Sequence, residues 1–271
     1  MKGREIRAAL HAGQRVYSTA VIATSHRWPE AVQHAGCDFV FIDSEHTPLD
    51  RETLAWICQA YRAVDVPPVV RIPSPDPYEA AKVLDGGAGG VIAPYIESAD
   101  QVRELAAVAR YRPLKGDRVA AAVRDVDSLE PELRRYLDDR NSDTILIANI
   151  ESVPAIENLD EILSVAGLDS VLIGPHDLSC SLGIPEQYGH PQFDQAVRTI
   201  FRKARQHHVG AGIHFWMDLE QEIEWAAAGG NLVMHSSDLA LFRQNLEQEF
   251  NQIRAALDDN RDPPNASDDV V

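Results

Sequence analysis

Four short apolar segments of this chain each end in an acid, a base or a cation. They are residues 39–46 (FVFIDSEH), 68–71 (PVVR), 145–151 (ILIANIE) and 171–177 (VLIGPHD). In a parallel barrel the carboxyl ends of all strands lie at one rim, so these polar residues would meet in one pocket although they are far apart in sequence. Carboxylates, a guanidinium and an imidazole in one pocket indicate catalysis rather than packing.

Glu151 and Asp177 are candidate metal ligands because each is the last residue of one of these segments. Two carboxylates leave most of an octahedral shell open for water and a chelating substrate, which favours Mg²⁺ or Mn²⁺ over zinc and also admits Co²⁺. The alternative is that each acid caps the helix after its strand, and for one acid alone that is the better interpretation. When both acids are considered together with the other strand ends, metal binding is favoured over helix capping.

Arg71 and His46 supply the cation and the base. A guanidinium at the end of a buried strand would be partly desolvated, so Arg71 should face a carboxylate or an enolate oxygen. The alternative is a structural ion pair with Asp43 or Glu45. Histidine as a residue type suits a general base, and His46 could be oriented by Asp43 or Asp85, whereas a lone loop histidine is more often only solvated.

Further polar and aromatic residues follow the last two apolar runs. They are residues 214–216 (HFW) and 235–237 (HSS). They would also reach the rim, where shaping a substrate pocket and simple rim packing are equally good interpretations.

Eight apolar runs recur along the chain, with helical segments between them. They span residues 15–22, 38–43, 67–72, 90–95, 144–150, 170–174, 209–214 and 230–236. Most are too apolar to alternate, which is typical of strands buried on both faces. Helix start signals precede several intervening segments, at Asp76, Ser98 and Asp218, and Gly86 is a helix stop. The pattern predicts an α/β fold, a (β/α)8 TIM barrel.

Three segments depart from the regular alternation. Residues 110–143 form a Pro- and charge-rich insertion, long enough for an active-site loop or a subunit contact. Residues 239–257 predict a final amphipathic helix. One domain is therefore expected over residues 1–257, followed by a disordered acidic tail at 258–271.

Composition limits the classes of partner. The chain has 271 residues, 45% hydrophobic and 25% charged, and a formal net charge of −17, which predicts no binding to nucleic acid or to an anionic membrane surface. No apolar run approaches the ~20 residues needed to span a bilayer. The first residues lack the apolar core of a signal peptide. Three widely spaced cysteines complete the pattern of a cytoplasmic protein with reduced thiols.

These segments, in this order, resemble the HpcH/HpaI family of metal-dependent class II aldolases acting on pyruvate-type 2-oxo acids. The resemblance extends over residues ~15 to 255, the size of a family barrel. The run from 151 to 183 is its most specific part. Besides the segments at 39–46 and 68–71, the matching pieces are VLDGGA (83–88), ARYRPLKGDR (109–118), ES (151–152), ENLDEIL (157–163) and GPHDLSCSLG (174–183).

The resemblance implies a role for each rim residue. Glu151 and Asp177 would bind the divalent metal, Arg71 would hold the keto or enolate oxygen, and His46 would be the general base, helped by Asp43 or Asp85 and acting through a water. Further substrate contacts would come from Asn149, Gly174, Pro175 and Ser179.

The implied reaction is reversible retro-aldol cleavage of a 4-hydroxy-2-oxo acid to pyruvate, or a related 2-oxo acid, and an aldehyde. The 2-oxo acid would chelate the metal, and the metal and Arg71 would stabilise the enolate. No Schiff-base lysine is needed, and Lys82 and Lys115 fall in a helix and a loop. The family also implies a homo-oligomer, a hexamer built from dimers that exchange the last helix.

Four positions depart from the family pattern, namely Tyr17, Val119, Asn149 and His235. These departures predict an altered aldehyde side of the implied pocket, so the aldehyde is not specified by sequence. Two other functions compete with the aldolase. One is a citryl- or malyl-CoA lyase, which would need a cationic, adenine-accepting surface. The other is a barrel kept for binding or assembly without catalysis.

Overall fold

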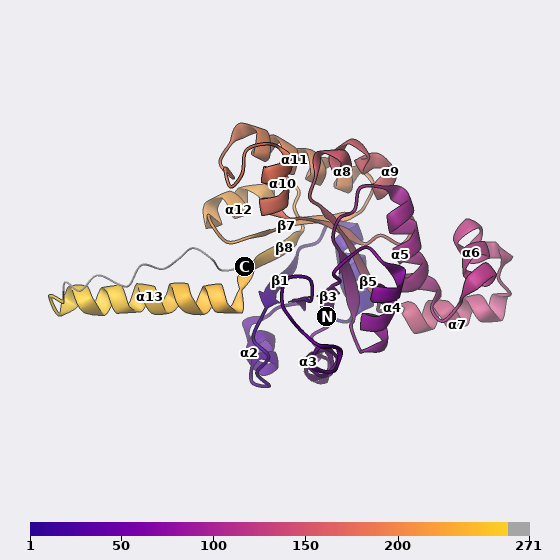
Figure 1. Ribbon diagram of the computed structural model, residues 1–271, viewed down its shortest axis with the longest axis horizontal. Coiled ribbons are helices and arrows are strands. Elements are labelled where there is room, and N and C mark those ends of the chain that lie inside the picture. Colours follow the sequence, from indigo (N-terminus) through magenta and orange to yellow (C-terminus); the bar gives the residue numbers. More distant parts are fainter. Residues whose placement is uncertain (260–271) are drawn as a thin grey trace.

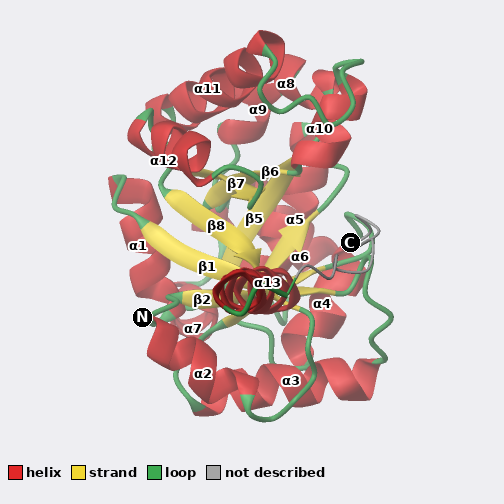
Figure 2. Cartoon of the chain, turned by 90° about the vertical axis from the view of Figure 1, so that its left-hand side faces the viewer, coloured by secondary structure: helices red, strands yellow, loops and turns green. Residues whose placement is uncertain are grey.

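The computed structural model describes residues 1–259 and shows a closed barrel of eight parallel strands that neighbour one another in sequence order (Figures 1 and 2). The predicted TIM barrel is confirmed, and each predicted apolar run coincides with one strand, although β7 and β8 each extend one residue past their runs. The strands are β1 (Val16–Val21), β2 (Phe39–Asp43), β3 (Pro68–Arg71), β4 (Gly90–Ala93), β5 (Ile145–Ile150), β6 (Ser170–Ile173), β7 (Gly210–Phe215) and β8 (Leu232–Ser237).

Helices occupy the segments between the strands, with an additional helix at each end of the barrel sequence. They are α1 (Gly3–Ala12), α2 (Trp28–Ala35), α3 (Arg51–Ala63), α4 (Pro77–Asp85), α5 (Ala99–Tyr111), α6 (Gly116–Arg124), the short 3₁₀ helix η1 (Val126–Ser128), α7 (Pro131–Asn141), α8 (Val153–Glu157), α9 (Leu159–Leu163), α10 (Pro175–Ser181), α11 (Pro191–Gln206), α12 (Leu219–Ala227) and α13 (Asp238–Ala256). None of these helices is both long and apolar enough to cross a membrane.

The strands are apolar on both faces because each face has its own core. Phe39, Phe41 and Ile147 belong to the cluster inside the barrel. The alternate residues Val40 and Ile42 belong to the cluster between sheet and helices. Burying each such side chain stabilises the fold by roughly 1.5–3 kcal/mol, so packing on both faces of the sheet stabilises these apolar strands.

The predicted helix starts are present as side-chain caps. The carboxylate of Asp76 accepts from the backbone N–H of Tyr78, and that of Asp218 accepts from two N–H groups of α12. Ser98 forms the predicted capping box with Gln101. These caps fix where α4, α12 and α5 leave the rim, because each satisfies backbone donors that the helix itself leaves free.

The insertion at 110–143 folds as helices rather than as a loop. α6, η1 and α7 follow the end of α5 and enclose a small apolar cluster of Ala122, Leu129 and Leu137. They precede the first residue of β5, so they are attached at the end of the barrel opposite the carboxyl rim. Within one chain the insertion therefore lies away from the active-site rim, and its role as a subunit contact stays a prediction.

An ionic cluster ties α1 to the same end of the barrel. Asp169 is fully buried and contacts Arg7 (2.9 Å), Arg110 (2.5 Å) and the Nε2 atom of His11 (3.1 Å). Its Oδ2 atom also accepts from the backbone N–H of Leu146, 2.8 Å away. Burial alone would raise the pKa of Asp169, but these partners lower it to about 2.

The first and last strands close the barrel along an irregular seam. The pairing of β1 with β8 shifts register between Ser18 and Ala20. Opposite this shift Ser236 has a φ of 54°, in the left-handed region that is unusual for a serine. Next to it, the Asp238 carboxylate accepts from the backbone N–H groups of Ile22 (3.0 Å) and Ala23 (2.9 Å).

The predicted final helix is present as α13, which leaves the barrel after β8 and projects away from it (Figure 1). Several large apolar side chains on it are exposed, among them Phe242, 61% exposed, and Ile253, 53% exposed. The predicted exchange of this helix between subunits is not shown in a single chain. The predicted acidic tail lies, from residue 260 onward, outside the described residues.

Candidate active site

Arg71 lies at the carboxyl rim between two acids of the β2 end. Its Nε and Nη2 atoms donate to the two carboxylate oxygens of Asp43, over 2.9 and 2.6 Å, and Nε is 3.1 Å from Oε2 of Glu45. Burial would lower the pKa of Arg71, but the bonds from Asp43 and the charges of both acids outweigh it and raise the pKa. The ion pair that the sequence left open as an alternative is therefore present, and it holds the guanidinium in a fixed orientation.

Glu151 follows β5 and is buried, with 9% of the residue exposed. Its Oε2 accepts from the backbone N–H of Tyr95 (3.1 Å) and its Oε1 from Nδ2 of Asn149 (2.7 Å). Desolvation raises the pKa of Glu151, and the charge of Asp177 raises it further. The two carboxylates are thus close enough to repel each other in a partly dry environment.

Asp177 lies in the first turn of α10, which begins at Pro175 just after β6. Gly174 provides room at this junction, because a Cβ atom there would lie 2.7 Å from Oε1 of Glu151. The fit to a divalent cation is good: a cation beside Glu151 and Asp177 would relieve their repulsion. Within residues 1–259 no cluster of three or more His, Cys, Asp or Glu side chains is arranged for a metal, so water and substrate would fill the other positions.

His46 lies in the loop after β2 and its side chain is 47% exposed. The carboxylate nearest its imidazole is Glu45, with Oε2 3.7 Å from Nε2. Asp43 meets His46 only at the backbone, where its Oδ1 accepts from the His46 N–H over 3.4 Å, while both of its carboxylate oxygens also accept from Arg71. Within one chain, the acid next to the imidazole is thus Glu45 and not the expected Asp43.

Asp85 is not brought to this site within one chain. It is the last residue of α4, which runs back from the rim toward the start of β4. Its side chain is 72% exposed, and its ion-pair partner is Arg112 at 3.8 Å. Asp85 therefore does not face His46 within one chain, and its role in orienting His46 stays a prediction.

Two of the predicted substrate contacts have other partners. Ser179 is fully buried, and its hydroxyl donates to the carbonyl of His176 (2.7 Å) and accepts from the N–H of Glu186 (3.0 Å). That hydroxyl therefore stabilises α10 and the following loop. Asn149 orients the Glu151 carboxylate, while its buried Oδ1 atom has no hydrogen-bond partner in the described structure.

Tyr95 is a site residue that the sequence did not reveal. It follows β4 with a φ of 56°, and its side chain interacts with Glu45, which raises the pKa of the phenol to about 12. The phenol therefore stays protonated at the rim, above Glu45 and near Glu151. Only its place at the end of the apolar run at 90–95 could have suggested a rim position, because a tyrosine with a positive φ has no sequence signature.

The departures from the family pattern lie in different places. Tyr17 is near the start of β1, away from the rim, and Val119 is in α6. His235 faces outward and its Nδ1 atom is 2.7 Å from Oε2 of Glu222 in α12. Of the four, Asn149 alone contacts the rim carboxylates. Unlike His235, His214 belongs to the interior of the barrel mouth, where its ring contacts Phe41 with centroids 5.5 Å apart.

This barrel, with two acids at the ends of β5 and β6 and an arginine at the end of β3, agrees with the comparison to known proteins. The family model described as HpcH/HpaI aldolase/citrate lyase matches residues 21–245. The chain belongs to this family. A curated relative, the 2-keto-3-deoxy-L-rhamnonate aldolase of Shigella sonnei (strain Ss046), is 34% identical over 235 residues, covering 84% of this chain and 85% of the relative.

Solved structures of similar proteins extend the comparison to the fold. The HpcH/HpaI aldolase from Desulfitobacterium hafniense DCB-2 is 27% identical, with a TM-score of 0.78 over 92% of this chain and 96% of that one. A structure described as citrate synthase SbnG is 28% identical, with a TM-score of 0.78 over 93% of this chain and 98% of that one. The chain is an enzyme of the carbon–carbon lyase class, an aldolase, and neither the CoA-thioester lyase nor the non-catalytic barrel is favoured.

Proposed function

We propose that this aldolase cleaves a 4-hydroxy-2-oxo acid reversibly to pyruvate, or a related 2-oxo acid, and an aldehyde, and that it depends on a divalent metal. The observation that carries the proposal is the adjacency of Glu151 and Asp177 at one rim with the carboxylate-held Arg71. The relative's named substrate, a 2-keto-3-deoxy sugar acid, supports the same chemical class and a role in sugar-acid catabolism.

Glu151 and Asp177 are the residues that would hold Mg²⁺ or Mn²⁺, with Co²⁺ as a further candidate. A cation there supplies Lewis-acid polarisation of the ketone oxygen. The protein contributes the orientation of Glu151, whose two oxygens are fixed by Tyr95 and Asn149. A carboxylate fixed in this way needs little reorganisation when the cation and substrate bind.

Arg71 stabilises the negative charge that develops on the substrate's keto oxygen. Asp43 holds the guanidinium on one side, so its remaining donors point in a defined direction without reorganisation. The ring of Phe41 lies 5.4 Å from the guanidinium carbon and keeps water from one face. The arginine is therefore preorganised for an oxyanion in a partly dry site.

His46 moves the proton. Its exposed imidazole can take a proton from the 4-hydroxyl, through a water, and return a proton to the C3 carbon of the enolate. Oε2 of Glu45 lies 3.7 Å from Nε2 of the imidazole, close enough to help orient the ring. No lysine carries out a covalent step in this scheme.

The test is metal-dependent exchange of the C3 protons of pyruvate in deuterated water, followed by NMR. Exchange should require Mg²⁺, Mn²⁺ or Co²⁺ and fall at least about 10²-fold in Glu151→Gln and Asp177→Asn. Glu157→Gln, an exposed carboxylate in the helix after β5, is the matched control and should exchange normally. Absence of exchange with every metal rejects the enolate mechanism, and exchange that survives both substitutions rejects the metal assignment.

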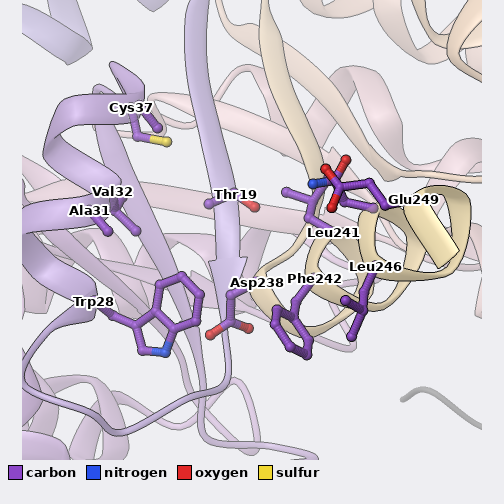
Figure 3. Close-up of a pocket in the computed structure, with 12 residues that line it drawn as sticks. Thr19, Trp28, Ala31, Val32, Cys37, Asp238, Leu241, Phe242, Leu246 and Glu249 are labelled. Atoms are coloured by element: carbon purple, nitrogen blue, oxygen red, sulfur yellow. The ribbon is translucent and has the colours of Figure 1, made fainter. Parts of the chain in front are cut away.

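We also propose that the protein assembles as a homo-oligomer, a hexamer built as a trimer of dimers that exchange α13. The groove at the base of this helix has a volume of about 470 Å³ and is lined by Trp28 and Val32 of α2 and by Leu241, Phe242 and Leu246 of α13 (Figure 3). Exposed apolar residues on both sides would be covered by α13 of a second copy.

The proposed location of the protein is the cytoplasm. The free cysteines Cys37, Cys58 and Cys180 are consistent with that reducing compartment.

A further inference from the structure

His214 is a histidine inside the barrel mouth that the proposed mechanism does not use. Its neighbours on β7, Ile213 and Phe215, belong to the cluster between sheet and helices. Successive strand residues point to opposite faces, so the His214 side chain points into the barrel. There it lies against Phe41, with ring centroids 5.5 Å apart, and against Trp216, with centroids 5.0 Å apart.

One nitrogen of this imidazole is committed to the backbone. Nε2 lies 2.9 Å from the carbonyl oxygen of Ser236. A carbonyl oxygen can only accept, so Nε2 carries the proton and donates. The left-handed backbone of Ser236 (φ 54°) turns this carbonyl toward the ring, and the hydroxyl of Thr19 donates to the same oxygen over 3.4 Å.

The other nitrogen is a free acceptor. Desolvation lowers the pKa of His214 to about 4, so the imidazole is neutral at physiological pH. With the proton on Nε2, Nδ1 presents an unshared electron pair. Nδ1 has no hydrogen-bond partner within residues 1–259, although part of the residue is solvent-accessible.

This acceptor lies beside the oxyanion-binding group. Phe41 contacts both His214 and the guanidinium of Arg71, which is 5.4 Å from the ring centroid. Glu151 follows β5 and Asp177 lies in α10 after β6, so His214 is in the mouth but on the β7–β8 side. A substrate whose keto oxygen meets Arg71 would extend its far end past Phe41 toward Nδ1.

We propose that His214 is a specificity-determining residue for the aldehyde half of the reaction, and that its Nδ1 accepts a hydrogen bond from a hydroxyl group next to the aldehyde carbon. This inference rests on the proposed aldol reaction and names the class of its second substrate, 2-hydroxyaldehydes. A methyl group at the same position would leave Nδ1 unpaired, and a carboxylate would bring an acceptor against an acceptor. Both are therefore disfavoured.

The experiment compares two aldehydes of nearly equal shape in condensation with pyruvate. Glycolaldehyde carries a hydroxyl where propionaldehyde carries a methyl group. With the metal-loaded enzyme, we expect kcat/KM for glycolaldehyde to exceed that for propionaldehyde by about 10²-fold or more. The ratio should fall about tenfold or more in His214→Leu and be largely kept in His214→Asn, whose amide retains a polar atom near the position of Nδ1.

His235→Asn is the matched control, because His235 ends the neighbouring strand but faces α12, where it contacts Glu222. The ratio of kcat/KM for glycolaldehyde to kcat/KM for propionaldehyde should be the same in His235→Asn as in the wild type. A wild type without preference for glycolaldehyde, or an unchanged ratio in folded His214→Leu, overturns the inference. If circular dichroism shows that His214→Leu does not fold, the inference is tested by the wild-type preference for glycolaldehyde and by whether His214→Asn keeps that preference. Loss of pyruvate exchange in the wild type would instead reject the proposed aldolase mechanism.

Discussion

The guanidinium of Arg71 is fixed by geometry as much as by charge. Two of its nitrogens match the two oxygens of Asp43, and a lysine could keep the charge but not this paired contact. We expect Arg71→Lys to lower kcat about 10²-fold or more, as loss of a preorganised oxyanion donor does. Steady-state cleavage kinetics with metal-loaded enzyme measure this. A variant with wild-type kcat would show that Arg71 has only a structural role.

Tyr95 and Glu45 form a second contact at the rim whose loss should be milder. Tyr95→Phe removes the phenolic hydroxyl that interacts with Glu45 but keeps the ring. A lost hydrogen bond to a charged group costs about 1.5–3 kcal/mol, so we expect a rate reduction of roughly 10- to 100-fold. Tyr78→Phe, at an exposed tyrosine of α4, provides the control. Equal rates for both variants would remove Tyr95 from the site.

The rim positions of Glu151, Asp177 and Arg71 could be predicted from sequence because each lies at or just after the end of a strand whose position in a barrel is fixed by topology. The pairing of His46 with Glu45 could not. That pairing depends on how the loop after β2 turns, and on the prior commitment of Asp43 to Arg71. Tyr95 was missed for a similar reason, since its backbone conformation is set by the surrounding structure.

At the level of elements, the strands were predictable because both faces of each are buried in separate cores. The insertion between α5 and β5 was not. α6 and α7 are largely exposed and bury only Ala122 and Leu137 among their apolar residues, so few apolar side chains mark them in the sequence. Their attachment opposite the rim follows only from the direction of α5, which sequence alone does not show for an irregular segment.

The buried cluster around Asp169 should contribute strongly to the stability of the elements it joins. Asp169→Asn would leave Arg7 and Arg110 without their shared anion in a buried environment. We expect a loss of about 3–5 kcal/mol in the free energy of unfolding, measured by urea denaturation. Asp143→Asn breaks an exposed pair with Arg4 and should cost about 1 kcal/mol or less. Equal losses would contradict this account.

The same cluster predicts a pH dependence. The pKa of Asp169 is lowered to about 2 in the folded protein, against about 3.9 in unfolded chains. The folded state therefore gains stability from this ionised group above pH ~4, and loses that gain as the pH falls toward 2. Urea denaturation of wild type and Asp169→Asn at several pH values should show their difference shrinking in this window. A constant difference would mean that the carboxylate is not ionised as described.

For the whole molecule, α13 is the element that one chain leaves uncovered. Phe242→Glu would place a charge on its apolar side, at the groove that also contains Trp28. We expect the variant to dissociate into smaller species, measured by size-exclusion chromatography with light scattering. Gln248→Glu adds the same charge at an exposed polar position and should leave the assembly intact. A wild type that is monomeric, or a variant of unchanged mass, would contradict the exchanged helix.

The seam between β1 and β8 has a consequence for biosynthesis. The strand that pairs with β1 ends at Ser237, so a nascent chain cannot close its sheet until nearly all of the 259 described residues have left the ribosome. Until then β1 has an open edge on that side, a site for pairing with other chains. The carbonyl of Ser236 and the carboxylate of Asp238 lie at this last junction. The ribosome must therefore synthesise the whole barrel before His214 can bond to the carbonyl of Ser236.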